Sequence, residues 1–374
     1  MSCFAGLLLL LAAAAPASID TLAGADSRAP AAVPGSAFAR VDSLAPATLA
    51  DSALARADSL AAAIVADSAF ARADSRSAVA DSVSGPPSLP VVSVTLVGDG
   101  AGDAGLIDPT GIAVDTFGRV YVTDAGSHRL LRLDTQGKPT AEFGSLGSDP
   151  SQLQRPSGVA LLGTLGVAVL DRDNRRVVTV DLFGRPLGTL IDLASIELER
   201  RVGRIDASAI ASDRGGALAL LDRERDRVLL FDFAGRFVRE VGGLGATAGS
   251  FRGLRGLAYG PRGELVCADR GNARLQRLDA GGRVAATWPV AVTPGAASLP
   301  LAVDAGGRVA MADEAGGTLR LWSADGVLLF ETSGLRRPRA LAFGSDGSLL
   351  VAETSPVRIR RLTFGISASP PRER

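Results

Sequence analysis

The sequence predicts an all-β protein, a six-bladed β-propeller that occupies residues 88–365. The first observation behind this prediction is an acidic residue that ends an apolar stretch and returns six times, at Asp124, Asp171, Asp222, Asp269, Asp313 and Glu353. The second is that each acid is followed by short runs of alternating apolar residues, separated by Gly and Asp turns. A repeat of roughly 40 to 50 residues that contains only short strands is typical of four-stranded sheets arranged radially.

Each unit contains the same four strands. The first is apolar, as in residues 112–114; the second runs into the acid, as Val120 to Asp124 does. The third begins near an arginine five residues after the acid, although the fifth unit has Thr318 there. The fourth follows a turn of the form D-x-x-G. No interval within a unit is long enough for a helix of about ten residues and its loops.

The recurring acid and arginine predict a structural pair. They flank a four-residue hairpin loop, so we expect them to face each other across the strands as an ion pair. A catalytic acid would not be needed six times. A glycine stands six residues before the acid in five units, whereas the second unit has Leu165, and we expect these glycines to supply turns with positive φ.

The N-terminal end of the propeller region predicts how the ring closes. The sixth unit has only three good strands, the last ending near Leu362, whereas residues 91–97 form an extra strand before the first unit. We predict that residues 91–97 pair with residues 357–362 and complete the last blade. Closure of this kind removes a free sheet edge that would otherwise promote aggregation.

The segments outside the propeller predict export. Residues 1–19 carry an apolar run from Leu7 to Leu11 and a small-x-small site at residues 15–17, which indicates a signal peptide. An N-terminal anchor stays open as an alternative, although the run is short for a span of about 20 residues. We therefore expect a bacterial protein that is secreted, periplasmic or attached to the cell envelope.

Residues 20–87 carry a second repeat of 16 residues, whose units begin with Asp-Ser pairs and are rich in alanine. Their larger apolar residues recur five or six apart, which makes no single helical stripe. We interpret this segment as a low-complexity spacer, partly helical or disordered, and a docking or oligomerising role is the alternative. Residues 366–374 are expected to be a polar tail.

Composition excludes several classes of function. Forty basic and forty acidic residues cancel, so the sequence does not predict binding to nucleic acid, or to a membrane except through an uncleaved N-terminal segment. Two cysteines cannot form a disulfide framework, and Cys267 is expected to be buried and inert. His128 is the single histidine, which argues against a histidine-based triad or zinc site.

Several segments resemble the NHL repeat. The first runs from Asp108-Pro109-Thr110-Gly111 through Gly118 and Asp124 to His128-Arg129-Leu130, and the second from Arg155-Pro156-Ser157-Gly158 to Arg176. A third copy contains Gly256, Asp269, Asn272 and Arg274, whereas the third and fifth units are degenerate. The resemblance covers residues 91–365 and implies a six-bladed propeller, but it does not name a function.

A calcium-dependent enzyme is the alternative function. Six-bladed propellers similar to gluconolactonases hold a divalent ion in the central channel, with carboxylate and amide ligands. The Asp residues of this chain are nearly all accounted for by turns, and no ligand set can be matched. We therefore predict no catalytic residues, no metal ligands and no cofactor, and leave calcium and lactonase or hydrolase activity open.

Arginines on one loop face are the predicted binding residues. The loops between second and third strands and the connections between blades should emerge on the same face, and both are rich in arginine. Arginine matches carboxylate and phosphate geometry, so we expect an exported, non-catalytic propeller that binds a protein or an anionic polysaccharide, with a solvated rim as the alternative. The candidate residues are Arg155, Arg172, Arg175, Arg223, Arg225, Arg252, Arg255, Arg336, Arg337 and Arg339.

Overall fold

The computed structural model describes residues 90–98, 104–163 and 165–365. The expected signal peptide, spacer and tail, at 1–19, 20–87 and 366–374, lie outside these residues. The chain divides into two units, Met1–Val79 and Ala80–Arg374, and every described residue belongs to the second. Within that described part, no helix combines the length and the apolar character needed to span a bilayer.

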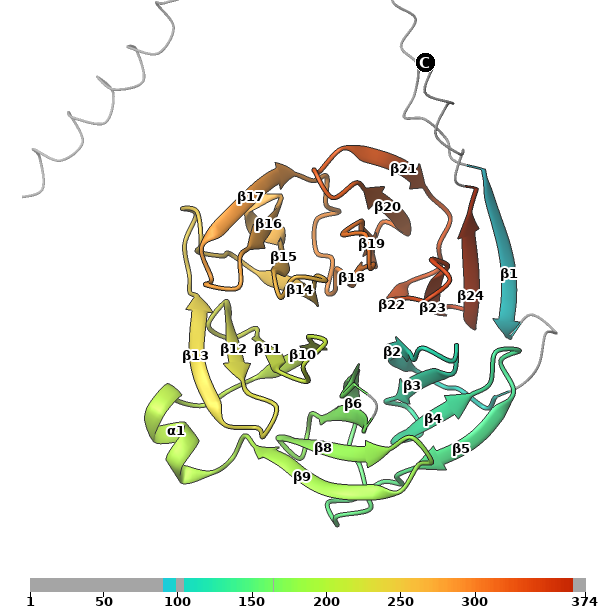
Figure 1. Cartoon of the computed structure of the whole chain (residues 1–374), viewed down its shortest axis with the longest axis vertical. Coiled ribbons are helices and arrows are strands. Elements are labelled where there is room, and N and C mark those ends of the chain that lie inside the picture. The colour runs from blue at the N-terminus through green and yellow to red at the C-terminus, as the bar shows by residue number, and fades with distance from the viewer. Residues whose placement is uncertain (1–89, 99–103, 164, 366–374) are drawn as a thin grey trace, which may run out of the picture. The chain divides into compact units, whose positions relative to one another are not determined.

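The described residues form six four-stranded antiparallel sheets around a central axis (Figure 1), which we call blades 1 to 6. In blades 1 to 5 the strands follow chain order from the centre outward, whereas the outermost strand of blade 6 is the first strand of the described chain. Blades 1 to 3 consist of β2 (Pro109–Val114), β3 (Val120–Asp124), β4 (Arg129–Leu133), β5 (Pro139–Phe143); β6 (Pro156–Leu161), β7 (Gly166–Asp171), β8 (Arg176–Asp181), β9 (Pro186–Asp192); and β10 (Ala207–Ser212), β11 (Leu218–Asp222), β12 (Arg227–Phe231), β13 (Phe237–Gly242).

Blades 4 to 6 repeat this arrangement, so the predicted all-β six-bladed architecture is confirmed. Their strands are β14 (Leu254–Tyr259), β15 (Leu265–Asp269), β16 (Arg274–Leu278), β17 (Val284–Pro289); β18 (Leu301–Val303), β19 (Val309–Asp313), β20 (Thr318–Trp322), β21 (Leu328–Thr332); and β22 (Pro338–Phe343), β23 (Leu349–Thr354), β24 (Val357–Phe364), with β1 (Val91–Val97). A single 3-10 turn, η1 (Arg270–Asn272), lies in the β15–β16 loop.

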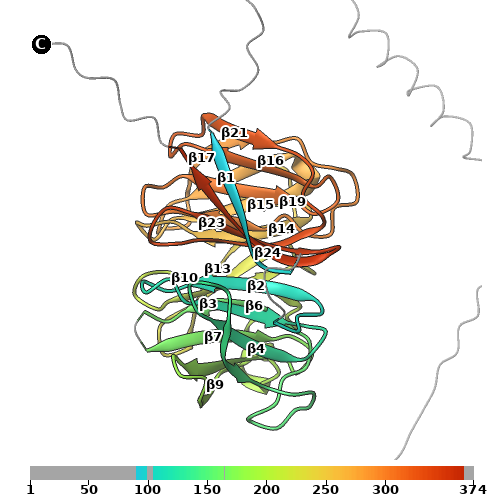
Figure 2. The ribbon, with the colours of Figure 1, turned by 90° about the vertical axis from the view of Figure 1, so that its right-hand side faces the viewer.

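The outer strand of blade 6 comes from the other end of the domain. β1 lies beside β24 in both ribbon views (Figures 1 and 2) and pairs with it antiparallel, from Val91 opposite Phe364 to Val97 opposite Ile359. The strand order of this sheet is therefore β1-β24-β23-β22. Strands that are distant in sequence thus share one ladder, and the outer edge of β24 is covered.

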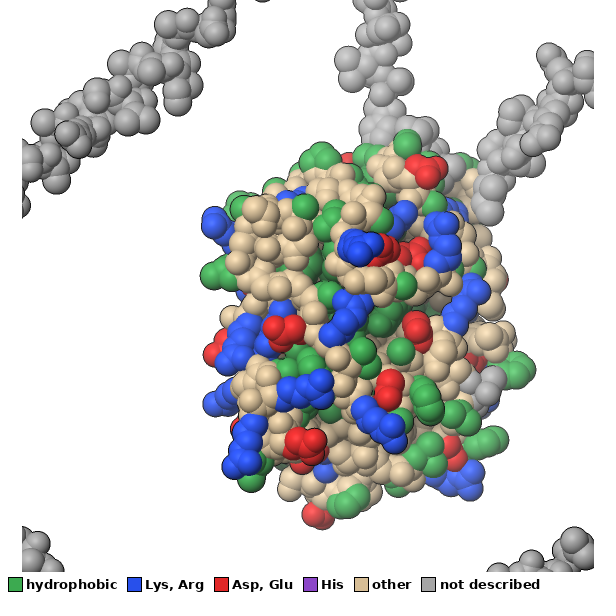
Figure 3. Space-filling view, turned by 60° about the vertical axis from the view of Figure 1, so that its left-hand side comes forward, with side chains coloured by type: hydrophobic (Ala, Val, Ile, Leu, Met, Phe, Trp, Pro, Cys, Tyr) green, Lys and Arg blue, Asp and Glu red, His purple; other side chains and the backbone are tan. Residues whose placement is uncertain are grey.

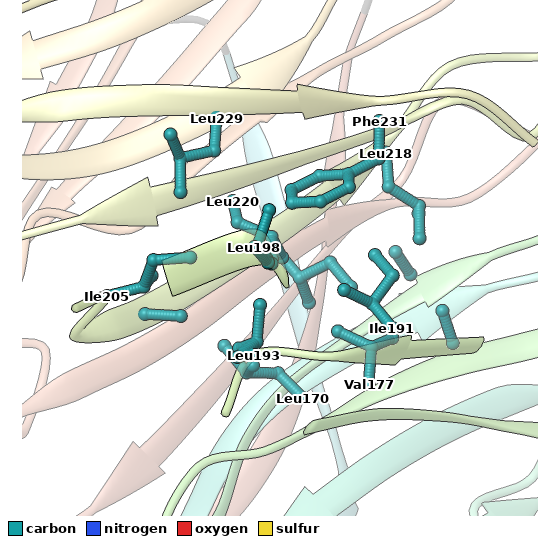
Figure 4. Close-up of a cluster of buried hydrophobic side chains, with 14 of the residues drawn as sticks. Leu170, Val177, Ile191, Leu193, Leu198, Ile205, Leu218, Leu220, Leu229 and Phe231 are labelled. Atoms are coloured by element: carbon teal, nitrogen blue, oxygen red, sulfur yellow. The ribbon is translucent and has the colours of Figure 1, made fainter. Parts of the chain in front are cut away.

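The core lies between the blades. Six clusters of buried apolar side chains each draw on two neighbouring blades. Figure 4 shows the cluster between blades 2 and 3, where Leu170 and Val177 meet Leu218 and Phe231. Burying one such side chain contributes about 1.5–3 kcal/mol, so the contacts between neighbouring sheets hold the ring together.

The recurring acids are structural, as predicted. Each is at most 1% exposed and lies opposite the residue five positions later in the β ladder. Asp269 accepts hydrogen bonds from Arg274 Nε at 2.7 Å and from the backbone NH of Arg252, and so fixes both the hairpin and the connection before β14. Direct ion pairs of this kind form at Asp171–Arg176, Asp222–Arg227, Asp269–Arg274 and Glu353–Arg358.

Blade 1 uses a hydroxyl in place of the direct pair. Ser127 donates to Asp124 and accepts from Arg129 Nε at 2.9 Å, while Arg129 forms its ion pair with Glu142. The turn glycines also behave as predicted: the five that stand six residues before the acid have φ between 77° and 85°, a region that a residue with a Cβ rarely adopts.

A short helix, α1 (Ile196–Val202), occupies the connection from blade 2 to blade 3 and was not predicted from the sequence. It lies in the longest of the five steps between recurring acids, from Asp171 to Asp222. Ser195 caps its N-terminus by accepting from Leu198 N. Leu198 (Figure 4) packs into the core between blades 2 and 3, and Val202 belongs to the same cluster. The helix brings a cluster of arginines close to one end of these two blades.

Candidate functional site

A cavity of about 740 Å³ lies on the face where the second-to-third strand loops and the connections between blades emerge. We call it the mouth pocket. Loops of blades 2 and 3 and the first strand of blade 4 form its walls, so the two loop classes emerge on one face as predicted. Its charged lining is six arginines against three carboxylates: Arg155, Arg172, Arg175, Arg204, Arg223 and Arg255, with Asp173, Asp206 and Glu224.

Part of this charge is neutralised within the pocket. Asp206 lies between Arg172, at 3.0 Å, and Arg223, at 3.8 Å. Arg155 approaches Asp173 at 3.8 Å. These are partly exposed pairs of the kind that contributes up to about 1 kcal/mol each, so they orient side chains and leave most donors available to a ligand.

Arg175 has a structural task. Its guanidinium binds the carbonyl of Leu193 at 3.1 Å and the carboxylate of Glu199 in α1. Its backbone has φ of 52°, and the equivalent hairpin positions His128, Asp226 and Ala273 also have positive φ. Arg175 therefore fixes α1 against blade 2 and also lines the pocket.

Two arginines of the mouth pocket have no carboxylate partner. Among the described residues Arg204 has no hydrogen-bond or ion-pair partner at all. Arg255 donates only to the carbonyl of Leu254, at 2.7 Å. Burial, reinforced by the positive charges of Arg270 and Arg223, lowers the pKa of Arg255 from its usual value. An anion placed here would be attracted to positive charge that no direct ion pair within the described residues neutralises.

The mouth pocket adjoins the central channel. The channel is a narrow cavity of about 100 Å³, lined by the innermost strands and the segment before β18, and Arg255 lines both cavities. Its polar side chains are Thr110, Ser157, Ser208, Ser298, Arg255 and Arg339. Hydroxyl and guanidinium donors thus surround the channel.

This donor set does not fit calcium. Calcium prefers carboxylate, carbonyl and amide oxygens, whereas the channel lining contains none of Asp, Glu, Asn or Gln. Across residues 90–98, 104–163 and 165–365 there is also no group of three or more His, Cys, Asp and Glu side chains that could hold a metal ion. The arrangement favours an anion over a divalent cation.

The remaining predicted residues are not gathered into the mouth pocket. Arg225 donates to the carbonyl of Val202 and caps the end of α1. Arg252 and Arg336 donate backbone NH groups to the recurring acids of blades 4 and 6, and their side chains are exposed. Arg337 and Arg339 both contact Glu314 Oε1, at 3.1 and 3.3 Å. Five of the ten candidates therefore line one cavity.

Glu314 is the main residue that the sequence analysis missed on this face. Its side chain is 4% exposed, and it directly follows the recurring acid Asp313. Arg204 was also absent from the ten candidates, although it lies in a connection between blades, one of the two arginine-rich loop classes predicted to share this face. In Figure 3 arginines and carboxylates lie interspersed across one side of the molecule, so colour alone does not separate paired from unpaired arginines.

His128 and Cys267 have the structural roles that the sequence predicted. His128 lies in the β3–β4 hairpin loop, where its Nδ1 accepts from the backbone NH of Arg155 at 3.0 Å. Cys267 is fully buried in β15, and burial raises the pKa of its thiol. Neither residue offers a nucleophile or general base to a ligand in the mouth pocket.

Comparison with known proteins agrees with the architecture. The family model described as NHL repeat matches residues 106–133, which cover the first three strands of blade 1. The chain thus contains a match to the NHL repeat in blade 1, and its described residues form a six-bladed β-propeller. It is 26% identical over 285 residues to the human E3 ubiquitin-protein ligase NHLRC1, which covers 70% of this chain and 68% of that protein.

A second relative shares a shorter region. The protein brain tumor of Drosophila melanogaster is 26% identical over 140 residues, covering 36% of this chain and 12% of that protein. The aligned part of this relative is thus a small fraction of a longer polypeptide.

Solved structures with the same fold include enzymes. A gluconolactonase from Xanthomonas campestris superimposes with a TM-score of 0.55 at 15% identity, covering 75% of this chain and 96% of that one. The calcium-binding protein regucalcin from Agrobacterium tumefaciens gives 0.53 at 16% identity, with 74% and 95% covered. At these identities the likeness shows the fold alone.

Proposed function

We propose that this propeller is a non-catalytic binding domain whose mouth pocket takes an acidic segment of a partner protein. The observation that carries the proposal is the excess of arginine in that cavity, where Arg204 and Arg255 have no carboxylate partner among the residues that the structure describes. Arginine forks bind carboxylates in a bidentate manner. A cavity of about 740 Å³ is large enough for several side chains of an extended segment.

The protein partner is favoured by the shape and the chemistry of the site. The pocket also contains Asp173 and Glu224, which would repel a uniformly sulfated or carboxylated polysaccharide but can pair with basic residues interspersed in a peptide. A relative named as an E3 ubiquitin-protein ligase carries the same repeat. An anionic polysaccharide is the alternative occupant that the experiment must separate.

The fuller proposal places the domain outside the cytoplasm. The apolar residues 1–19 would direct export, and residues 20–87 would separate the propeller from the point of export. N-terminal sequencing of the protein recovered from a periplasmic or culture fraction tests this: cleavage near Ala17 supports export, and an intact Met1 in a cytosolic fraction contradicts it.

The binding proposal is tested by calorimetric titration of a synthetic Glu- and Asp-rich peptide. We expect Arg204→Gln combined with Arg255→Gln to weaken binding at least tenfold, with an unchanged melting temperature. The matched control combines Arg214→Gln with Arg283→Gln, two exposed arginines in turns at the opposite end of blades 3 and 4. The control removes equal charge and should leave affinity within twofold.

Three outcomes would overturn the proposal. Equal losses in the two double variants would mean that binding follows net charge alone. Binding of a sulfated polysaccharide without binding of the acidic peptide would assign the site to a glycan. A melting temperature that rises with calcium and falls with a chelator would favour the hydrolase alternative.

A further inference from the structure

The innermost strands share a distortion that aims one side chain into the channel. In five of the six blades the pairing of the first and second strands shifts by one residue near the start of the first strand. The residue inside each shift lines the central channel. β-Bulges re-aim side chains in this way and are frequent next to functional sites. The five bulge residues are Thr110, Ser157, Ser208, Arg255 and Arg339.

Two of these residues already have strong partners. Thr110 donates to the carbonyl of Pro156 at 2.7 Å and so links blades 1 and 2. Arg339 contacts the buried carboxylate of Glu314. Their bulges are therefore explained by contacts between neighbouring blades, and neither presents a strong unused donor to the channel.

The other three bulge residues lie in consecutive blades and are not satisfied. Ser157 Oγ is buried and has no hydrogen-bond partner within the described residues. The hydroxyl of Ser208 likewise has none there, and Arg255 has only the carbonyl of Leu254. A buried polar atom without a partner costs about 1–3 kcal/mol and calls for an explanation, such as a bound ion.

We propose that Ser157, Ser208 and Arg255 form an oxyanion subsite where the mouth pocket meets the channel. The subsite takes a single carboxylate, phosphate or sulfate group of a ligand lying in the pocket. Arg255 supplies charge and two parallel N–H donors, and the serines of the two preceding blades supply O–H donors. The channel volume of about 100 Å³ suits one such group and excludes a larger one.

The identity of the ligand in the subsite rests on the proposed function, but oxyanion binding itself can be tested without any partner protein. Sulfate, phosphate and acetate are titrated into the full chain at constant ionic strength, with heat and melting temperature as readouts. Sulfate stabilises many proteins by exclusion from their surface, so the decisive quantity is the difference between variants. We expect wild-type protein to bind at least one of these ions and Arg255→Gln to lose that binding.

Ser157→Ala supplies the sharper test, because the unpartnered hydroxyl contributes nothing favourable to the protein without an anion. We expect this variant to melt in anion-free buffer at or above the wild-type temperature, yet to bind the oxyanion about tenfold more weakly. Arg214→Gln, on the opposite face, should change neither value. Unchanged oxyanion affinity in Ser157→Ala overturns the subsite, as does a lower melting temperature without anion, which would assign the hydroxyl a structural role.

The subsite and the proposed function can fail separately. Oxyanion binding that depends on Ser157 and Arg255, without capture of an acidic peptide, would retain the subsite and overturn the proposed function. Capture of the acidic peptide that is insensitive to Ser157→Ala would retain the proposed function and overturn the subsite. Peptides with free and amidated C-termini, compared with inorganic phosphate, show whether the group held is a chain-terminal carboxylate, a side-chain carboxylate or a phosphate.

Discussion

The mouth pocket at blades 2 to 4 and the same face of blades 5 and 6 carry arginines at equivalent positions. The two regions differ in whether a carboxylate pairs with these arginines. Arg255 and Arg339 occupy the same bulge position in blades 4 and 6. The blade before Arg255 has Arg223 directly after its recurring acid. The blade before Arg339 has Glu314 at the same position. Glu314 contacts Arg339 at 3.3 Å. The pKa of Arg255 is lowered by burial first, and then by the positive charges of Arg270 and Arg223.

We infer that an arginine on this face is available for binding only where the neighbouring blade provides no carboxylate to pair with it. One position, occupied by Arg223 in one blade and Glu314 in another, decides whether the bulge arginine of the next blade forms an ion pair or remains without one. The same logic separates Arg204 from Arg274, which is held by a buried carboxylate. Four experiments test whether pairing separates structural from binding arginines, in order of decreasing effect.

Deletion of residues 91–97 should have the largest effect, because blade 6 would lose its outer strand and β24 would become an exposed edge. We expect aggregated or unfolded protein by size-exclusion chromatography and circular dichroism. This result would establish that blade 6 serves closure of the ring. A monomeric deletion variant with the wild-type melting temperature would contradict it.

Arg274→Gln and Arg204→Gln should give opposite results. Arg274 binds the buried Asp269 at 2.7 Å, and its loss leaves a buried charge unpaired, which costs about 3 kcal/mol. Arg204→Gln should stay within about 0.5 kcal/mol yet weaken acidic-peptide binding, whereas Arg274→Gln should leave that binding intact. Urea unfolding and calorimetry measure the two quantities, and a shared loss of both in either variant would refute the distinction.

Glu314→Gln should leave the arginines of blades 5 and 6 without a carboxylate partner, as Arg204 and Arg255 are in the mouth pocket. The change removes the carboxylate that holds Arg337 and Arg339 and should cost about 1.5–3 kcal/mol of stability, because hydrogen bonds between charged groups are lost. Acidic-peptide affinity should rise. Glu331→Gln, which breaks a pair with Arg320 at the outside of blade 5, is the matched control and should not alter binding. Unchanged peptide binding in Glu314→Gln would show that pairing does not decide function.

The smallest effect concerns an acid at the opposite end of blade 6. Ser348 donates to Asp346 at 2.6 Å and lowers the pKa of that carboxyl below 3.8. The resulting stability is fully present above the unfolded pKa and is lost as pH falls through the folded pKa. Ser348→Ala should therefore reduce the free energy of unfolding at pH 5 to 7 by less than about 1 kcal/mol, and the difference from wild type should vanish near pH 2. A difference that persists there would assign the effect to packing.

The fold was largely predictable because it rests on local, repeated chemistry. The spacing of Asp171 and Arg176 and the turn glycines depend on neighbours within one blade, and the structure places them as expected. The site was only partly predictable because it depends on contacts between blades. The sequence does not show that Arg337 is paired with a carboxylate and that Arg255 is not. This difference depends on the positions of Glu314 and Arg223 in the ring.

Calorimetric titration of one acidic peptide against two double variants tests the central claim most directly. The first variant combines Arg204→Gln with Arg255→Gln, and the second combines Arg337→Gln with Arg339→Gln, so both lose two arginines from the same face. We predict at least a tenfold loss of affinity in the first variant and less than a twofold change in the second. Equal losses, or a larger loss in the second, would contradict the claim that unpaired arginines of blades 2 to 4 make the binding site.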